Sequence, residues 1–247
     1  MGGTAIPPSP QSDVALGLRE NRGQFVLLVA INAFVGAMVG LERTVLPLLA
    51  EQDFGITSAA VAASLVGGFG LAKAITNLFA GAVAERITRR RTLVLGWAFG
   101  VPVPLLIIWA PAWEWVVFAN VLLGINQGLA WSMTVNMKVD LVGPRRRGLA
   151  LGFNETAGYM AVGVFAFVSG LVAEQWGARP EPFYLGIALA TVALALSAIF
   201  VRDTTAHMQL EARQHSSVAS HPVPLRQRLL HRRLRGSHRS PRSSAGS

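Results

Sequence analysis

The sequence contains no cysteine, and this absence excludes several kinds of site at once. A disulfide framework, a thiolate metal site and a cysteine nucleophile all require Cys side chains. Charged residues are also scarce, at 14% of the 247 residues against about 25% in soluble domains. Hydrophobic residues make up 52% of the chain, and the mean hydropathy is +0.44. This composition argues against a soluble globular protein.

Histidine is missing from the first 206 residues. That part of the chain therefore has no imidazole for a proton relay, a metal site or a catalytic triad. It also has neither a Gly-x-Ser-x-Gly elbow nor a phosphate-binding Gly-Lys-Ser/Thr loop. We therefore expect no enzymatic activity, no catalytic residue, and no metal or other cofactor.

The formal net charge of +9 lies mostly in one segment. From Arg202 to Ser247, nine Arg stand against two acidic residues, which is a net charge of +7. This segment is rich in Arg, Ser, His and Pro and has no hydrophobic periodicity, so we predict a basic, disordered cytoplasmic tail over 203–247. Such a tail can bind anionic lipid, and we expect no specific nucleic-acid partner. The alternative is that the tail reflects a truncation or frame shift and carries no selected function.

Six windows of the chain are long and apolar enough to cross a membrane, which takes roughly 20 mainly apolar residues. They are Phe25–Leu49, Ile56–Val83, Thr92–Trp109, Trp113–Val135, Leu149–Val172 and Phe183–Val201. The second is the weakest, because Lys73, Asn77 and several Gly and Ser residues dilute it. The sequence therefore predicts an all-α membrane protein with six transmembrane helices over 24–202. A polar, proline-rich cytoplasmic lead-in over 1–23 precedes them.

Basic residues gather on one side of these windows. They precede window one and lie between windows two and three and between windows four and five: Arg19, Arg22, Arg86, Arg89, Arg90, Arg91, Lys138, Arg145, Arg146 and Arg147. The opposite loops hold one basic residue, Arg179. Because Lys and Arg near span ends are retained in the cytoplasm, we expect both termini to be cytoplasmic.

The loop between windows two and three has a characteristic spacing. It reads Gly81-Ala-Val-Ala-Glu85-Arg86-Ile-Thr88-Arg89-Arg90-Arg91. This resembles the signature loop of the major facilitator superfamily, Gly-x-x-x-Asp-Arg-x-Gly-Arg-Arg, with Glu85 in the acidic position and Thr88 where the second Gly is usual. The resemblance implies that Gly81 permits close helix approach. It also implies that Glu85 and Arg86 form a charge lock, since a carboxylate is stabilised at a helix N-terminus and arginine can bridge it.

The loop between windows four and five is similar to that of the same superfamily, in which an acid ends one helix and an Arg-Gly pair starts the next. Here Asp140 is the acid, and Arg146 with Gly148 provides the basic and small residues. We expect Asp140 to pair with Arg146 across the turn and Pro144 to stop the preceding helix.

The resemblance extends from about Phe25 to Glu211 and implies an N-terminal six-helix half, built as two inverted three-helix repeats. Spans one and four would line a cavity, and spans three and six would face lipid. The implied function is secondary active transport of a small solute by alternating access in the plasma (inner) membrane. Alternating access needs a second bundle, so we expect a homodimer or a separate second half. The alternative is a truncated, non-transporting membrane remnant or an assembly partner of a second half-transporter.

Four ionisable residues lie inside the windows, where they are candidates for function because an unpaired charge in lipid is costly. They are Glu42, Arg43, Lys73 and Glu155. An Arg in span one followed by a Lys in span two resembles the organic-anion and organophosphate branches of the superfamily. This implies that Arg43 and Lys73 bind an acid group of the substrate. The alternative is a structural ion pair between Lys73 and Glu155.

The remaining candidates are polar residues of spans four and five. Asn126, Gln127 and Tyr159 could line the same cavity, although amides in membranes usually bond across helices. Glu42 and Glu155 are the candidates for proton coupling. Because Glu42 and Arg43 are neighbours about 100° apart on a helix, we expect them not to face one cavity.

Small residues and prolines predict how the helices pack. Glycines recur at four-residue spacing, which lets another backbone come close: Gly36/Gly40, Gly96/Gly100, Gly124/Gly128 and Gly148/Gly152. Pro102 and Pro104 remove backbone donors in the third window and predict a kink there.

Overall fold

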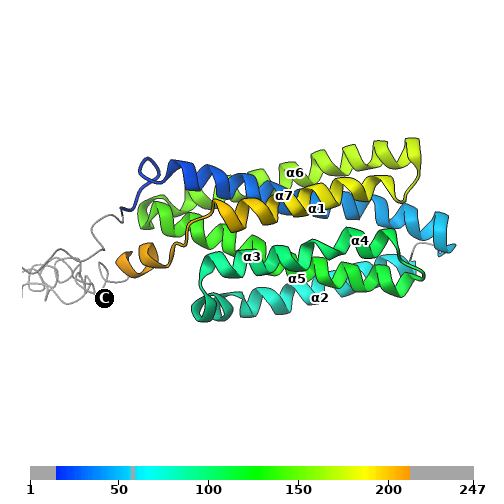
Figure 1. Ribbon diagram of the computed structural model, residues 1–247, viewed down its shortest axis with the longest axis horizontal. Coiled ribbons are helices and arrows are strands. Elements are labelled where there is room, and N and C mark those ends of the chain that lie inside the picture. The colour runs from blue at the N-terminus through cyan, green and yellow to red at the C-terminus, as the bar shows by residue number, and fades with distance from the viewer. Residues whose placement is uncertain (1–14, 57–58, 212–247) are drawn as a thin grey trace, which may run out of the picture. The chain divides into compact units, whose positions relative to one another are not determined.

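The computed structural model describes residues 15–56 and 59–211, apart from the side chain of residue 62. One compact unit runs to Met208, and a second begins at Gln209. Within the described residues of the first unit all regular structure is helical (Figure 1). The labelled helices are α1 (Arg22–Phe54), α2 (Ala59–Ile87), α3 (Arg89–Gly100), α4 (Pro102–Ile108), α5 (Trp113–Val142), η1 (Pro144–Arg146), α6 (Arg147–Trp176) and α7 (Glu181–Ile199). Residues 205–211 are helical as well.

These helices form six stretches that are long and apolar enough to cross a membrane, which confirms the predicted number. The third stretch consists of α3 and α4 and runs from Arg89 to Ile108. Its helix is interrupted at Val101, because Pro102 and Pro104 have no N–H to donate. The kink predicted from the two prolines is therefore confirmed.

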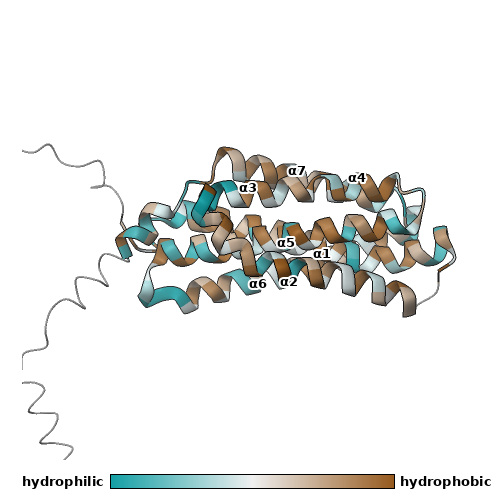
Figure 2. Ribbon diagram, turned by 90° about the horizontal axis from the view of Figure 1, so that it is seen from below, coloured by the Kyte–Doolittle hydropathy of each residue, from teal (hydrophilic) through white to brown (hydrophobic). Residues whose placement is uncertain are grey.

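Apolar residues cover most of the length of the helices (Figure 2). Arginines gather at one end, around the α2–α3 and α5–α6 connections, and we call this end the basic end; it is the left-hand end in Figure 1. The opposite end holds the α1–α2 and α4–α5 connections. The helices turn at glycines with positive φ: Gly55 (64°) follows α1, and Gly143 (73°) follows α5 directly before Pro144. Pro144 thus follows the helix end as predicted.

Close helix packing depends on three of the four glycine pairs. A Cβ added at Gly36 would lie 2.1 Å from the carbonyl oxygen of Gly158, so the backbones of α1 and α6 are in direct contact there. The Gly96/Gly100 pair packs against α5 in the same way, and the Gly124/Gly128 pair packs against α2. A Cβ at Gly148 or Gly152 would meet open space, so the expectation of close approach is wrong for that pair.

The helices differ in how much of them the bundle buries. In the most apolar window of each, 61% of α1 and 61% of α5 is buried, against 6% of α2 and 28% of α6. α1 and α5 are therefore the central helices. The polar and charged residues discussed below lie on α1 and α5 and on their less buried partners, α2 and α6.

Candidate functional site

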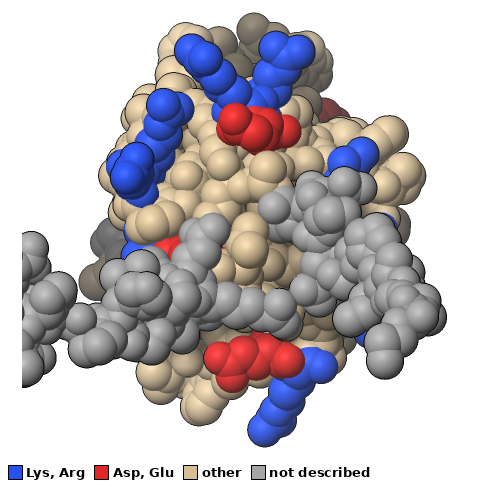
Figure 3. Space-filling view, turned by 90° about the vertical axis from the view of Figure 1, so that its left-hand side faces the viewer, with Lys and Arg blue, Asp and Glu red and all other residues tan. Residues whose placement is uncertain are grey.

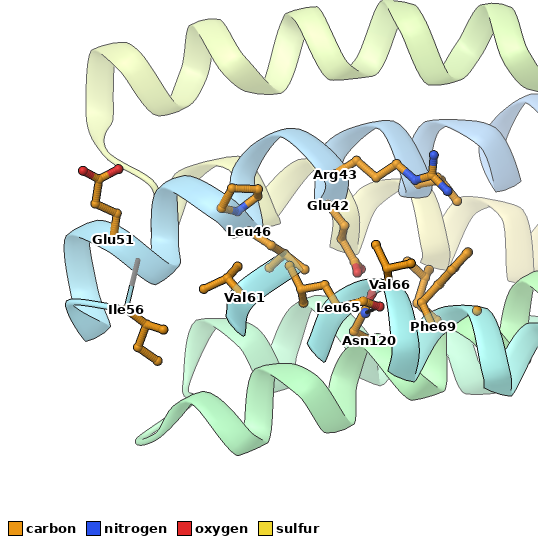
Figure 4. Close-up of a pocket in the computed structure, with 14 residues that line it drawn as sticks. Glu42, Arg43, Leu46, Glu51, Ile56, Val61, Leu65, Val66, Phe69 and Asn120 are labelled. Carbon is orange, nitrogen blue, oxygen red and sulfur yellow. Dashed lines mark hydrogen bonds between the residues drawn. The ribbon is translucent and has the colours of Figure 1, made fainter. Parts of the chain in front are cut away.

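A cavity of about 960 Å³ lies between α1, α2 and α5, in the half of the bundle toward the opposite end. Its walls are mainly apolar, and its charged lining residues are Glu42, Arg43 and Glu51 (Figure 4). Our expectation that Glu42 and Arg43 cannot face one cavity is therefore wrong. Neighbouring residues of a helix are about 100° apart around its axis, and the cavity curves around α1 far enough to be lined by both.

Glu42 is buried in the wall of this cavity. It is only 2% exposed, and neither carboxyl oxygen has a hydrogen-bond partner among the described residues. Figure 4 shows the carboxyl group pointing toward Asn120 of α5, whose amide donates to the carbonyl oxygen of Leu65 at 2.7 Å. An ionised carboxylate in this place would be desolvated and unpaired, which is costly. A protonated, neutral carboxyl group avoids most of this cost.

Arg43 and Lys73 come together at one aromatic ring. The guanidinium carbon of Arg43 lies 5.9 Å from the centre of the Phe69 ring, and Nζ of Lys73 lies 5.7 Å from it. Lys73 is also 5.1 Å from the ring of Trp131, which in turn contacts Tyr159 edge-on at 5.7 Å. Among the described residues neither cation has an ion-pair partner. Both basic groups therefore lie near aromatic rings, an arrangement that cation–π attraction stabilises.

The alternative ion pair between Lys73 and Glu155 is not formed in the described part of the chain. The Glu155 carboxylate instead accepts a hydrogen bond from the Asn154 amide at 2.9 Å. Glu155 is nevertheless only one turn from Gly158, against which the Trp131 ring beside Lys73 packs.

A buried polar network joins α1, α5 and α6 next to Glu155. The Asn32 amide donates to the backbone oxygen of Asn154 at 2.7 Å, and the Thr134 hydroxyl donates to Oδ1 of Asn32 at 2.9 Å. All three side chains are fully buried. Our reading of the sequence missed this network, although Asn32 and Thr134 both lie within the predicted windows.

Lys138 belongs to the same region and was also missed. We placed it in a loop, but α5 continues to Val142, and Lys138 is completely buried. Its ammonium group donates to the backbone oxygen of Leu28 at 3.3 Å. The available signal was its spacing: Trp131, Thr134 and Lys138 recur at intervals that share one helix face.

Asn126 and Gln127 are fully buried and bond across helices. The Asn126 amide donates to the backbone oxygen of Gly96 at 2.9 Å, and the Gln127 amide donates to that of Val35 at 2.8 Å. Neither lines the cavity described above. Tyr159 is not among the lining residues of that cavity either; it is 66% exposed and stands beside Trp131.

At the basic end the predicted gating residues have a different pattern of partners. Asp140 pairs with Nε of Arg89 at 2.8 Å and accepts a hydrogen bond from the Thr204 hydroxyl at 2.7 Å. Arg146, the partner we expected for Asp140, lies in the exposed turn η1. Basic side chains project at several points around this end (Figure 3).

The carboxylate at the start of α3 is Asp203, not Glu85. Oδ2 of Asp203 accepts from the backbone N–H of Arg90 at 3.0 Å, and Oδ1 accepts from that of Thr205 at 2.9 Å. Partial burial alone would raise the pKa of the Asp203 carboxyl, but hydrogen bonds from Thr205 and Arg90 hold the pKa below its usual range. Glu85 is instead exposed in the last turn of α2.

The other residues of the signature loop are more exposed than their expected roles suggest. Gly81 has no neighbour within 4 Å of an added Cβ, so it makes no close helix contact with the part of the chain that the structure describes. Arg86 is exposed, and no ion pair joins it to Glu85 in the part of the chain described. Thr88 has a φ of 89°, a conformation that is strained for a β-branched residue and easy for glycine.

The described residues include no group of three or more His, Cys, Asp or Glu side chains that could hold a metal ion. The comparison with protein families gives a clear match: a family model described as Major Facilitator Superfamily matches residues 25–239. This match runs beyond Glu211, where we placed the end of the resemblance, and so includes most of the basic tail.

Proposed function

Because the chain belongs to the major facilitator superfamily, a family of membrane transporters, we propose that it carries a small organic anion across the membrane by secondary active transport. The transport cycle is alternating access, in which two bundles rock about a solute site near the middle of the membrane.

The observation that carries this proposal is the convergence of Arg43 and Lys73 on the Phe69 ring. In the described part of the chain neither basic group is paired with a carboxylate, which is costly in a membrane, so an anionic ligand would stabilise them. Arginine can hold a carboxylate or phosphate with two parallel hydrogen bonds, and lysine adds a point charge. Phe69, Trp131 and Tyr159 supply aromatic surface for the apolar body of the solute.

Glu42 is the proposed coupling residue. A buried carboxyl without a partner can exchange a proton when the cavity beside it fills with water or solute. The proton would neutralise the carboxyl in one step of the cycle and leave it in another. The position of Glu42 directly before Arg43 would allow solute and proton occupancy to influence each other.

We also propose that the second bundle is another copy of this chain or a separate second half. The face that would meet it carries Lys73, Glu155 and Tyr159, which are polar groups unsuited to lipid. The basic end would lie in the cytoplasm of the cell, by the positive-inside rule. Arg89, Asp140 and the exposed Glu85 and Arg86 would then form the cytoplasmic gate.

The test is equilibrium binding of three labelled anions, benzoate, succinate and glycerol 3-phosphate, to purified protein. Loss of a bidentate contact in Arg43→Gln should weaken binding by at least about tenfold. Arg19→Gln, an exposed arginine outside the helices, is the matched control and should bind like the wild type. Equal affinity of wild type and Arg43→Gln for all three anions would contradict the proposed anion site.

A further inference from the structure

Glu155 of α6 lies between two lysines on different helices. Lys73 of α2 contacts the ring of Trp131, which packs against Gly158 of α6, one turn from Glu155. Lys138 of α5 lies one turn beyond Thr134, whose hydroxyl approaches Asn154. Among the described residues neither lysine forms an ion pair with Glu155. The two lysines differ in their surroundings. Lys73 is partly exposed beside Phe69 and Trp131, whereas Lys138 is fully buried.

The register of α5 against α6 fixes this arrangement. Trp131 lies against Gly158, where its ring is 2.5 Å from the position of an added Cβ. One turn nearer the basic end, the Thr134 hydroxyl approaches Oδ1 of Asn154 at 3.4 Å. Lys138 follows one turn later on the same face of α5. Along the axis of the bundle, Glu155 therefore lies between the level of Trp131 and the level of Lys138. The ring of Trp131 is the one that contacts Lys73.

The partners of the two lysines leave both in need of a negative charge. Nζ of Lys138 has one neutral acceptor, the backbone oxygen of Leu28 at 3.3 Å. Nζ of Lys73 rests on aromatic rings. Glu155 is held by the Asn154 amide at 2.9 Å, and Asn154 is itself part of the buried network. A single carboxylate thus lies near two cations and, in the described residues, is paired with neither.

We propose that Lys138 is a positioning residue that holds Glu155 away from Lys73 and so keeps Lys73 available for the acid group of the solute. This inference rests on the proposed anion site. When the solute leaves, Glu155 can move toward Lys73 and neutralise it, which would keep the empty site from retaining an unpaired cation. Lys138 acts through Glu155 and does not touch the solute.

The first experiment measures the affinity for benzoate, succinate and glycerol 3-phosphate in four proteins: wild type, Lys138→Met, Glu155→Gln and the double variant. Met keeps the length and volume of the lysine stem but removes its charge. Without Lys138, Glu155 should pair with Lys73 and lower the affinity for the anions that bind, by about fivefold or more. In Glu155→Gln and in the double variant Lys73 is free, so both should bind at least as tightly as the wild type.

Rescue by the second substitution separates this role from a general loss of structure. If Lys138→Met lowers the affinity equally with and without Glu155→Gln, Lys138 does not act through Glu155, and the inference is overturned. An unchanged affinity in Lys138→Met overturns it as well, while the anion site itself survives if Arg43→Gln still weakens binding. If no anion binds in an Arg43-dependent way, the proposed function fails and this inference fails with it.

The second experiment needs no ligand. In Glu155→Gln the buried Lys138 loses the nearby negative charge proposed to stabilise it, so the midpoint of thermal unfolding should fall, and Lys138→Met in the same background should raise it again. Glu174→Gln, an exposed carboxylate on the same helix, is the matched control and should leave the midpoint unchanged. Additive effects of the two substitutions on the midpoint would show that Lys138 and Glu155 do not interact and would overturn the proposal.

Discussion

Replacing Gly36 with alanine tests how closely α1 and α6 must pack to hold the polar network in place. The added Cβ would lie 2.1 Å from the carbonyl oxygen and 2.9 Å from the carbonyl carbon of Gly158. Both neighbours are backbone atoms of a long helix, so no side-chain rotation can relieve the clash. The two helices would have to separate by roughly 1 Å to restore an ordinary contact.

This separation affects the network one turn nearer the basic end. The hydrogen bond from Asn32 to the backbone oxygen of Asn154 is 2.7 Å long and fully buried, so a shift of that size would break or strain it. Overpacking and the loss of one buried hydrogen bond together should cost roughly 2–4 kcal/mol. Because Asn154 also holds Glu155, anion affinity should fall as well.

The assay is thermal unfolding in detergent, followed by anion binding at a temperature where the variant is folded. Gly163→Ala on α6 is the matched control, because its added Cβ meets nothing within 4 Å. That control should be as stable as the wild type or more stable, since alanine favours helix over glycine by about 1 kcal/mol. If Gly36→Ala unfolds at the same temperature as Gly163→Ala, the close contact between α1 and α6 does not contribute as described.

Four further predictions concern single residues. Glu42→Gln should preserve anion binding but abolish the acceleration of uptake by an imposed proton gradient, whereas unchanged acceleration would remove Glu42 from coupling. Glu85→Gln should reduce uptake without loss of membrane insertion, and unchanged uptake would remove Glu85 from the gate. Thr88→Gly should raise stability by about 1 kcal/mol by relieving the positive φ, while a destabilised protein would show that the threonine cap matters more. Asp203 has a lowered pKa in the folded protein, so its hydrogen bonds contribute stability above the usual aspartate pKa of about 3.9 and lose it as the pH falls through the lowered value. Hydrogen exchange at the Arg90 amide should therefore accelerate in strong acid and already be fast at neutral pH in Asp203→Asn; equal rates in both proteins at neutral pH would contradict this.

The number and positions of the helices could be predicted from the sequence, because a membrane span has a minimum apolar length. The kink at Pro102 and the close contact at Gly36 follow from the chemistry of single residues. Helix ends were harder to predict. α5 continues past Val135 to Val142, because a polar residue such as Lys138 can extend a helix when the neighbouring helices bury and bond it.

The partners of the charged residues could not be predicted from spacing. Asp140 pairs with Arg89, which lies 51 positions earlier in the chain, because the packing of α3 against α5 brings them together. Glu42 and Arg43 share a cavity, since its wall curves around α1. Both outcomes depend on how helices distant in sequence are arranged.

Counterflow in proteoliposomes tests the central claim most directly. Vesicles that contain the wild-type protein and an excess of an unlabelled anion from the binding panel are diluted into the same anion in labelled form. The account predicts transient accumulation of label that is lost in Arg43→Gln and in Lys73→Gln and retained in Arg19→Gln. Protein that binds the anion but accumulates no more label than protein-free vesicles would contradict transport by this chain.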